Sequence, residues 1–441
     1  MRAAPPETAV QPPLEWRTGV ASAGQVDARW WESFGDPTLA QLVDDARRNN
    51  PDVRVAIARV EEARATEAGS RALLLPSLSA GADGAYRREV SPFGRPQESL
   101  VAQPAFRAAY EVDLFGKNRA RLDAAKAGTA TRLAERDGAA LSVTAAAASG
   151  YIALLGLDAR SVVLQQTLRS REQARKFARD RARVGYTSQL EQRQAEAEYE
   201  ATAQLIPALT AQIARQENAL AILTGRLPGA IRPRGTLGRL ALPPVPAVLP
   251  SDLLRRRPDV AAAEYRIAAA DAQMRAARAQ FLPSINLGAT TGVALSDLLA
   301  DPITVWSIGA SVLAPIFQGG RLTAQLDTAT MQRDQAAWAY RGVALNAFRE
   351  VEDRLALSVG QQEQRRSLER QRVAVADALR HATNRYQAGY SPYIEQVDAQ
   401  RALLGIDQTL IRLEAEQLQN AVALYQAFGG PLGPERAPRR K

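Results

Sequence analysis

A chain of 441 residues with a net charge of +9 contains one histidine, His381, and no cysteine. This composition excludes disulfide frameworks, Cys/His zinc sites and thiol nucleophiles. Acidic residues are interleaved with the arginines almost everywhere, and the sequence has no basic stripe with interleaved aromatic residues, so we expect no nucleic-acid partner. We also expect no cofactor and no metal.

The chain begins with a Pro- and Ala-rich segment, residues 1–28, which we expect to be extended. It contains no apolar h-region, so no signal peptide is expected in this sequence. A short helix follows, with Asp36 as its N-cap, Pro37 at its first position and a stop at Asn50 before the next proline. Residues 1–50 therefore form an N-terminal segment that ends in a helix.

The sequence pattern of residues 51–225 predicts a helix, a β-hairpin and a long helical hairpin. The first helix ends at Pro76, where the periodicity changes. Alternation of apolar and polar residues over 77–115 predicts strands of about ten residues, apolar on one side and charged on the other. The helical pattern of 116–224 first runs without proline for a length of roughly 100 Å. Rods of that length are typical of coiled coils rather than globular cores.

The longest uncharged run, residues 138–157, is long enough for a transmembrane helix. It consists mostly of Ala with Ser, Thr and Gly, which is only weakly apolar and suits helices that approach each other closely. We therefore expect no membrane-spanning helix.

The second half of the chain repeats the first. Phe281–Ala289 matches Leu74–Ala82, 207 positions later. The repeat predicts a connector over 226–256, a second helix–hairpin–rod unit over 257–428 and a flexible basic tail over 429–441. Within the second unit we expect a β-hairpin over 284–317, whose second strand runs from Trp306 to Ile316, and a helical hairpin over 321–428.

Both long helical hairpins turn at a Gly-Tyr pair followed by a hydroxyl residue, and a glutamate follows four residues later. We predict that the glycines adopt the left-handed conformation that ends a helix. In the first tip, Ser188 and Glu191 also fit a capping box. Two tips of one design indicate a duplicated protein. The residues are Gly185, Tyr186, Thr187 and Glu191 in the first tip, and Gly389, Tyr390, Ser391 and Glu395 in the second.

One chain offers four strands, and a two-faced sheet of four strands is not stable alone. If its apolar face meets lipid, the open edges must close into a barrel, because unpaired backbone groups are costly in hydrocarbon. The alternation of apolar and polar residues is typical of outer-membrane strands, and closure by several chains is the natural solution. The alternative is a soluble sheet beside a coiled coil.

The ordered motifs resemble the outer-membrane factor family of tripartite efflux and secretion systems, the TolC/OprM-like channels, over nearly the whole chain and most closely in the OprM/NodT-like branch. Each motif is weak alone, whereas the ordered set at duplicated spacing is specific. The motifs are Trp30-Trp31-x-x-Phe34-Gly-Asp-Pro-x-Leu39, the paired Pro-Asp-Val and Leu-Pro-Ser elements, Asp113-Leu-Phe-Gly116, Pro315-Ile-Phe-Gln-Gly-Gly-Arg321, Val184-Gly-Tyr and Arg385-Tyr-Gln-Ala-Gly389.

The resemblance implies a mainly α, internally duplicated protein with a β-barrel. Three chains of four strands would form a 12-stranded outer-membrane β-barrel that continues into a coiled-coil α-helical barrel in the periplasm. The N-terminal segment and the connector would form an equatorial belt. Relatives usually carry a signal peptide and an acylated N-terminal cysteine; this sequence has neither, so we assign no lipid anchor.

By the same resemblance, the homotrimer would export small molecules such as drugs from a tripartite RND-type pump. Its partners would be a periplasmic adaptor, an inner-membrane pump and outer-membrane lipid. The alternative is a soluble coiled-coil scaffold or periplasmic adaptor without channel activity. An enzyme is disfavoured, because the single histidine lies in the middle of a rod and the sequence has no phosphate loop or metal cluster.

In the family, acidic rings constrict the periplasmic end of the tunnel and select cations. By motif match these rings fall on Glu395 and Asp398, which are spaced i, i+3 on one helix face. Arg401 follows three residues later and would pair with Asp398 within or between protomers. The alternative is a solvated acidic face near a helix N-terminus, where the helix dipole favours negative charge.

The family also closes its aperture through contacts between neighbouring hairpins, and Tyr386 and Glu191 occupy those positions. An arginine link found in some members would need Arg in place of Ser391. The resemblance further implies that Gly185, Tyr186, Gly389 and Tyr390 contact the adaptor. Basic residues crowd the end of the first rod and form either a docking surface or a solvated face; they are Arg169, Arg171, Arg175, Lys176, Arg179, Arg181 and Arg183.

Overall fold

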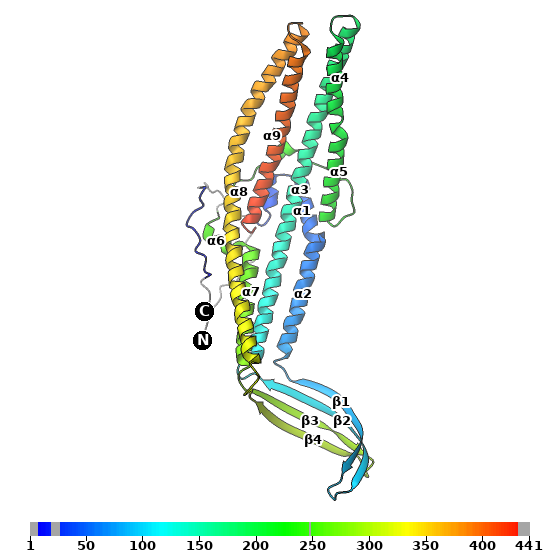
Figure 1. Ribbon diagram of the computed structural model, residues 1–441, viewed down its shortest axis with the longest axis vertical. Coiled ribbons are helices and arrows are strands. Elements are labelled where there is room, and N and C mark those ends of the chain that lie inside the picture. Colours follow the sequence, from blue (N-terminus) through cyan, green and yellow to red (C-terminus); the bar gives the residue numbers. More distant parts are fainter. Residues whose placement is uncertain (1–7, 19–26, 247, 431–441) are drawn as a thin grey trace. The chain divides into compact units, whose positions relative to one another are not determined.

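The computed structural model describes residues 8–18, 27–246 and 248–430. The predicted flexible tail after Gly430 and much of the predicted extended N-terminal segment lie outside these residues. The chain, drawn in Figure 1, divides into two compact units, and each unit draws on both sequence repeats. The first, here called the sheet unit, comprises residues 1–9, 58–134 and 261–343; the second, the hairpin unit, comprises residues 10–57, 135–260 and 344–441.

The sheet unit contains one antiparallel sheet with the strand order β1-β2-β3-β4. Strands β1 and β2 are longer than expected, at 14 and 17 residues. The fourth strand ends at Leu313, so the prediction that it continues to Ile316 is wrong: Pro315 has no N–H to donate to a strand ladder. The strands are β1 (Ser77–Val90), β2 (Pro96–Val112), β3 (Ser284–Ser296) and β4 (Ile303–Leu313).

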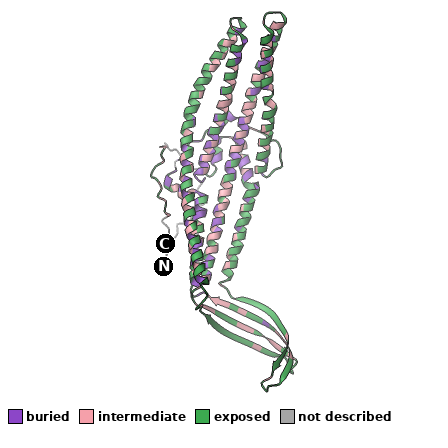
Figure 2. Cartoon of the chain, in the orientation of Figure 1, coloured by how far each residue is buried: buried purple, intermediate pink, exposed green. Residues whose placement is uncertain are grey.

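The register gives the sheet two chemically different faces, as the alternation predicts. Phe106 of β2 lies opposite Thr291 of β3, which lies opposite Trp306 of β4; on the other face, Arg107 lies opposite Thr290. Most of the sheet is coloured as exposed or intermediate (Figure 2), and its large apolar side chains include Trp306, 74% exposed, and Ile308, 79% exposed. The outer edges of β1 and β4 have no strand beside them in the described chain.

Four helices meet the sheet at one end in the sheet unit (Figure 1): α2 (Pro51–Ala72), α3 (Lys117–Arg183), α7 (Pro258–Ala279) and α8 (Arg321–Gln387). The carboxylate of Asp113 caps α3, accepting hydrogen bonds from the backbone N–H of Asn118 at 2.9 Å and of Arg119 at 2.8 Å. Small residues let the helices approach closely: Ala134 packs with Ala261 and Ala262.

The hairpin unit contains the two long helical hairpins. The first is formed by α3 with α4 (Gln189–Ala203) and α5 (Leu205–Leu223), and the second by α8 with α9 (Tyr393–Ala427). The sequence predicts one returning helix in the first hairpin, and this prediction is wrong, because the helix breaks at Gln204. Pro207 explains the break: it cannot donate to the carbonyl of Ala203, and its ring clashes with that carbonyl.

The hairpin unit also contains the short elements η1 (Trp30–Phe34), α1 (Pro37–Asn49), η2 (Leu237–Arg239) and α6 (Pro250–Arg256). Asp36 caps α1 as predicted, through the N–H groups of Thr38 and Leu39. Trp30 is buried and stacks on Tyr425 of α9 with ring centroids 5.2 Å apart. These contacts fix the short N-terminal elements to the helical hairpins.

The Ala-rich run of α3, residues 138–157, contributes many of the buried residues of the hairpin unit. By length and composition α3 is the one helix in the described residues that is apolar enough to cross a membrane, yet 56% of its apolar window is buried inside the protein. Gly150 lies against Leu220 of α5, and Gly156 lies against Ala415 of α9. Small residues on α3 therefore serve close helix packing.

Each repeat closes with the same kind of contact. The residue before Pro-Asp-Val binds the last carbonyls of that repeat's returning helix: the Asn50 side chain donates to the carbonyl oxygen of Leu223 at 3.1 Å, and Arg257 donates to that of Ala427 at 3.0 Å. The duplication seen in the sequence is thus also a duplication of structure.

Candidate aperture at the hairpin tips

Glycine ends the first long helix of each hairpin, as the sequence predicts. Gly185 and Gly389 have φ of 77° and 80°. The N–H of the following tyrosine, Tyr186 or Tyr390, returns to the carbonyl of Arg181 or Arg385 at 2.9 Å, the hydrogen bond of a Schellman motif. Both tyrosine side chains are 80% exposed. The turns therefore present two aromatic rings to solvent.

Just inside the tips, a cluster of buried residues packs the two hairpins of one chain together. Ala178 of α3 and Ala195 of α4 face Tyr386 of α8 and Tyr393 and Val397 of α9. The two tyrosine rings lie 5.2 Å apart between centroids. Small residues on one hairpin thus leave room for large rings on the other.

Tyr386 and Glu191, predicted to meet, do so between these two hairpins. The Tyr386 hydroxyl donates to Oε2 of Glu191 at 3.4 Å, and the Thr187 hydroxyl donates to the same oxygen. Ser188 caps α4 by accepting from the N–H of Glu191, which is half of the predicted capping box. Burial, followed by the charge of Glu191, raises the pKa of Tyr386 to about 12.

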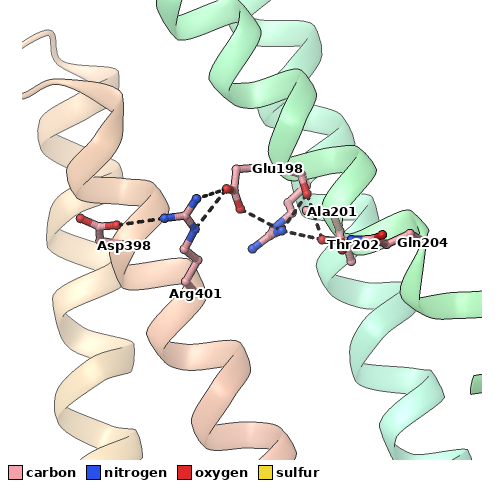
Figure 3. Close-up of polar contacts among 7 residues, drawn as sticks. Glu198, Ala201, Thr202, Gln204, Asp398 and Arg401 are labelled. Carbon is pink, nitrogen blue, oxygen red and sulfur yellow. Dashed lines mark hydrogen bonds and ion pairs between the residues drawn. The ribbon is translucent and has the colours of Figure 1, made fainter. Parts of the chain in front are cut away.

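A second polar link joins α9 to α4 (Figure 3), at residues farther along each helix from its tip than the cluster. Arg401 of α9 donates from Nε to Oε1 of Glu198 on α4 at 3.1 Å, and it also contacts Asp398 at 3.6 Å. Glu198 in turn pairs with Arg171 of α3 at 3.0 Å, and Arg171 donates to the Thr202 hydroxyl at 2.6 Å. The predicted Arg401–Asp398 pair exists, but it is the weaker contact of Arg401.

The sequence did not predict the part played by Glu198 and Arg171. Arg171 is 4% exposed and Glu198 is 6% exposed, so for Arg171 the interpretation as part of a solvated face or docking surface is wrong. A heptad signal was available. Leu164, Arg171 and Ala178 are spaced by seven residues on α3 and are all buried.

Glu395 and Asp398 lie in the first turns of α9 and are both exposed, whereas Gln396 and Val397 between them are buried. The i, i+3 spacing places the two carboxylates on one face of the helix. Asp398 also forms an ion pair with Arg401, with 3.6 Å between its Oδ1 and Nη1 of the arginine. In the described residues, no group of three or more His, Asp or Glu side chains could hold a metal ion.

A duplicated chain with an open four-stranded sheet and two long helical hairpins defines a class of outer-membrane channel subunits. The sequence model of the family described as "Outer membrane efflux protein" matches residues 42–226 and 249–430, and the chain belongs to this family.

Two curated relatives come from Pseudomonas putida. The pyoverdine export outer membrane protein OpmQ is 32% identical over 97% of this chain and 93% of its own length. The toluene efflux pump outer membrane protein TtgI is 34% identical over 94% of this chain and 92% of its own length.

Solved structures agree with the sequence comparison. The outer-membrane channel OprN superimposes with a TM-score of 0.90 at 27% identity, covering 97% of this chain and 98% of that one. The open state of the MtrE outer membrane channel of Neisseria gonorrhoeae gives a TM-score of 0.86 at 30% identity, covering 98% of each chain. The predicted family, fold class, channel function and location are confirmed. This chain is an outer-membrane efflux channel subunit that extends into the periplasm.

Proposed function

We propose that three copies of this chain form the exit duct of a tripartite pump, with four strands from each copy closing a 12-stranded barrel. The open sheet carries this proposal. Strands β1 and β4 each end the sheet, while apolar side chains such as Trp306 and Ile308 are exposed along its length. A hydrocarbon environment requires that such edges be paired, and pairing β4 of one copy with β1 of the next does so without a new element.

We propose that the hairpin tips form the periplasmic aperture. Three copies each of Glu395 and Asp398 around one axis would concentrate negative charge, which favours cations over anions. Two contacts, Tyr386 with Glu191 and Arg401 with Glu198, would hold the two hairpins of each chain together at this level. Because both contacts join separate hairpins, breaking them would let the hairpins separate and widen the aperture.

We propose that the tips also bind a periplasmic adaptor, which connects the duct to an inner-membrane pump. Tyr186 and Tyr390 are exposed, and the apolar side chains of Val184, Leu190 and Ile394 are exposed beside them. Exposed apolar residues at two tips of one design suit a repeated partner surface. Gly185 and Gly389 shape the turns that present these side chains.

For the cargo we propose small molecules such as drugs. The relatives are named for pyoverdine export, toluene efflux and cation efflux, so the duct of this family is not tied to one chemistry. We assign no catalytic step and no cofactor to the chain, whose part is passive conduction driven by the pump.

The proposal is tested by determining whether the purified protein is a membrane-embedded trimer. We expect the protein to be extracted from outer membranes only with detergent, to have the mass of three chains by native mass spectrometry, and to show three-fold symmetry in averaged electron micrographs. A monomer that stays in solution without detergent would contradict the proposal. Tyr186→Ala with Tyr390→Ala should leave the trimer intact but lower drug export, because only the adaptor contact is removed.

A further inference from the structure

A cavity of about 290 Å³ lies in the sheet unit where the strands meet the helices. Its lining combines apolar side chains with three basic and two acidic ones: Leu114, Phe115 and Leu313 with Lys117, Arg121 and Arg321, and Glu111 and Asp113. All of these residues follow or end a strand, or begin α3 or α8. The cavity therefore sits at the level at which a membrane-embedded sheet gives way to helices.

Two of the three cations in this lining have no acidic partner in the described chain. Lys117 is neutralised by Glu111 at 2.5 Å. By contrast, Arg121 makes a long hydrogen bond of 3.5 Å to Oδ1 of Asn118, and Arg321 binds only the side chains of Gln318 and Gln325. Two guanidinium groups on one rim favour an anion that can accept several hydrogen bonds, such as phosphate.

The second carboxylate of the lining, Asp113, is already engaged. It accepts hydrogen bonds from two N–H groups at the start of α3 and lies near Arg119. The matching position in the second repeat is Pro315, and Gly320, which precedes α8, has no side chain to cap that helix. The start of α8 is thus a second feature that favours a bound anion, beside Arg321.

Exposed apolar side chains belong to the lining or lie next to it in the sequence, since Ile316 and Phe317 stand between the lining residues Pro315 and Gln318. Ile316 is 93% and Phe317 is 88% exposed, and Leu114 and Leu313 are also exposed. These residues continue directly from β2 and β4, whose apolar face is assigned to lipid. An anion site bordered by exposed apolar side chains matches a molecule with a charged head and acyl chains.

We propose that this junction binds an anionic glycerophospholipid from the inner leaflet of the outer membrane. Arg121 and Arg321 bind its phosphate, and Leu114, Phe115 and Phe317 contact its acyl chains. This inference rests on the proposed membrane position of the sheet. It goes beyond a general lipid-facing surface, because it assigns a headgroup class to named residues at one level of the molecule.

The test is native mass spectrometry of the detergent-solubilised trimer titrated with phosphatidylglycerol or phosphatidylcholine. We expect the wild type to retain phosphatidylglycerol preferentially, and the variant Arg121→Gln with Arg321→Gln to bind it about tenfold or more weakly. Arg215→Gln, an exposed arginine on α5, is the matched control and should bind like the wild type. Arg121→Lys with Arg321→Lys keeps both charges and should retain part of the affinity.

Equal retention of phosphatidylglycerol by the wild type and by Arg121→Gln with Arg321→Gln would overturn the proposal that these two arginines bind the lipid phosphate. Equal binding of the two lipids by the wild type, or displacement of the lipid by millimolar inorganic phosphate, would overturn it as well. Single-channel conductance of the double Gln variant should match the wild type, since neither arginine lies at the tips. Normal conductance with unchanged lipid retention would therefore reject the lipid site and leave the channel standing.

Discussion

Nε of Arg401 on α9 lies 3.1 Å from Oε1 of Glu198 on α4, which joins the two helical hairpins of one chain. The two ends of this contact differ. Glu198 is buried and also pairs with the buried Arg171, whereas the side chain of Arg401 is 55% exposed. The carboxylate thus serves two guanidinium groups, one inside its own hairpin and one from the other hairpin.

Removing the carboxylate should therefore cost much more than removing the exposed arginine. Glu198→Gln leaves Arg171 buried without a counter-ion, and we expect a loss of about 3–5 kcal/mol in the free energy of unfolding. Arg401→Gln removes a largely exposed pair and should cost about 0–1 kcal/mol. Denaturant unfolding followed by circular dichroism measures both. A loss for Arg401→Gln that equals that of Glu198→Gln would contradict the asymmetry.

Tyr386 and Tyr393, which pack together in the buried cluster just inside the tips, allow a comparison of a bonded and an unbonded hydroxyl. The Tyr386 hydroxyl donates to Glu191, while the buried Tyr393 hydroxyl has no hydrogen-bond partner in the described residues. Tyr386→Phe should lower stability by about 1 kcal/mol and increase the time-averaged conductance by loosening the hairpins. Tyr393→Phe removes an unsatisfied hydroxyl and should be neutral or stabilising. Thermal melts and bilayer recordings of both variants test the difference, and identical behaviour would show that the Tyr386–Glu191 contact does not hold the hairpins together.

The raised pKa of Tyr386 gives a pH dependence. Its folded-state pKa of about 12 lies above the ordinary value of 10.0, so its contribution to stability is fully present below pH 10 and is lost as the pH rises toward 12. The stability of the wild type should therefore fall more steeply over this range than that of Tyr386→Phe. Parallel pH profiles of the two proteins would show that Tyr386 titrates alike in the folded and unfolded chains.

The architecture follows from the sequence because its signals are periodic or duplicated. The alternation from Leu78 to Tyr86 predicts the face that each side chain occupies, and the observed register agrees. The spacing of the repeats predicts both helical hairpins, and their tips are fixed by Gly185 and Gly389. Such signals survive without knowledge of tertiary contacts, since they depend on local backbone geometry.

The contacts between hairpins were harder to predict. Arg171 is one of seven basic residues near the end of the first rod, and only the heptad that it shares with Leu164 and Ala178 indicates that it is buried. Its partner Glu198 lies in a charge-rich segment with several equivalent glutamates. Pro207 is a local signal for a helix break, but the helical pattern continues on both sides of it, so the pattern alone predicts one uninterrupted helix.

Two glycines with similar backbone angles should respond differently to alanine. Gly225 and Gly185 have φ of 70° and 77°, so replacing either with alanine should cost roughly 1–2 kcal/mol, because alanine disfavours the left-handed conformation. A Cβ at Gly225 would also lie 2.6 Å from the carbonyl oxygen of Asn49, whereas none of the described atoms lies within 4 Å at Gly185. Gly225→Ala should therefore lower the melting temperature more than Gly185→Ala does. A larger effect at Gly185 would contradict the packing around Gly225.

Conductance across a planar bilayer tests the central claim that the hairpin tips of a trimeric duct form its acidic constriction. Recordings of the wild type should show a small, cation-selective conductance that multivalent cations block. Glu395→Gln with Asp398→Asn should change the conductance and relieve the block, while Glu414→Gln, farther along α9, should leave both at the wild-type value. Unchanged conductance and unchanged block in the double variant would contradict the placement of the constriction at Glu395 and Asp398.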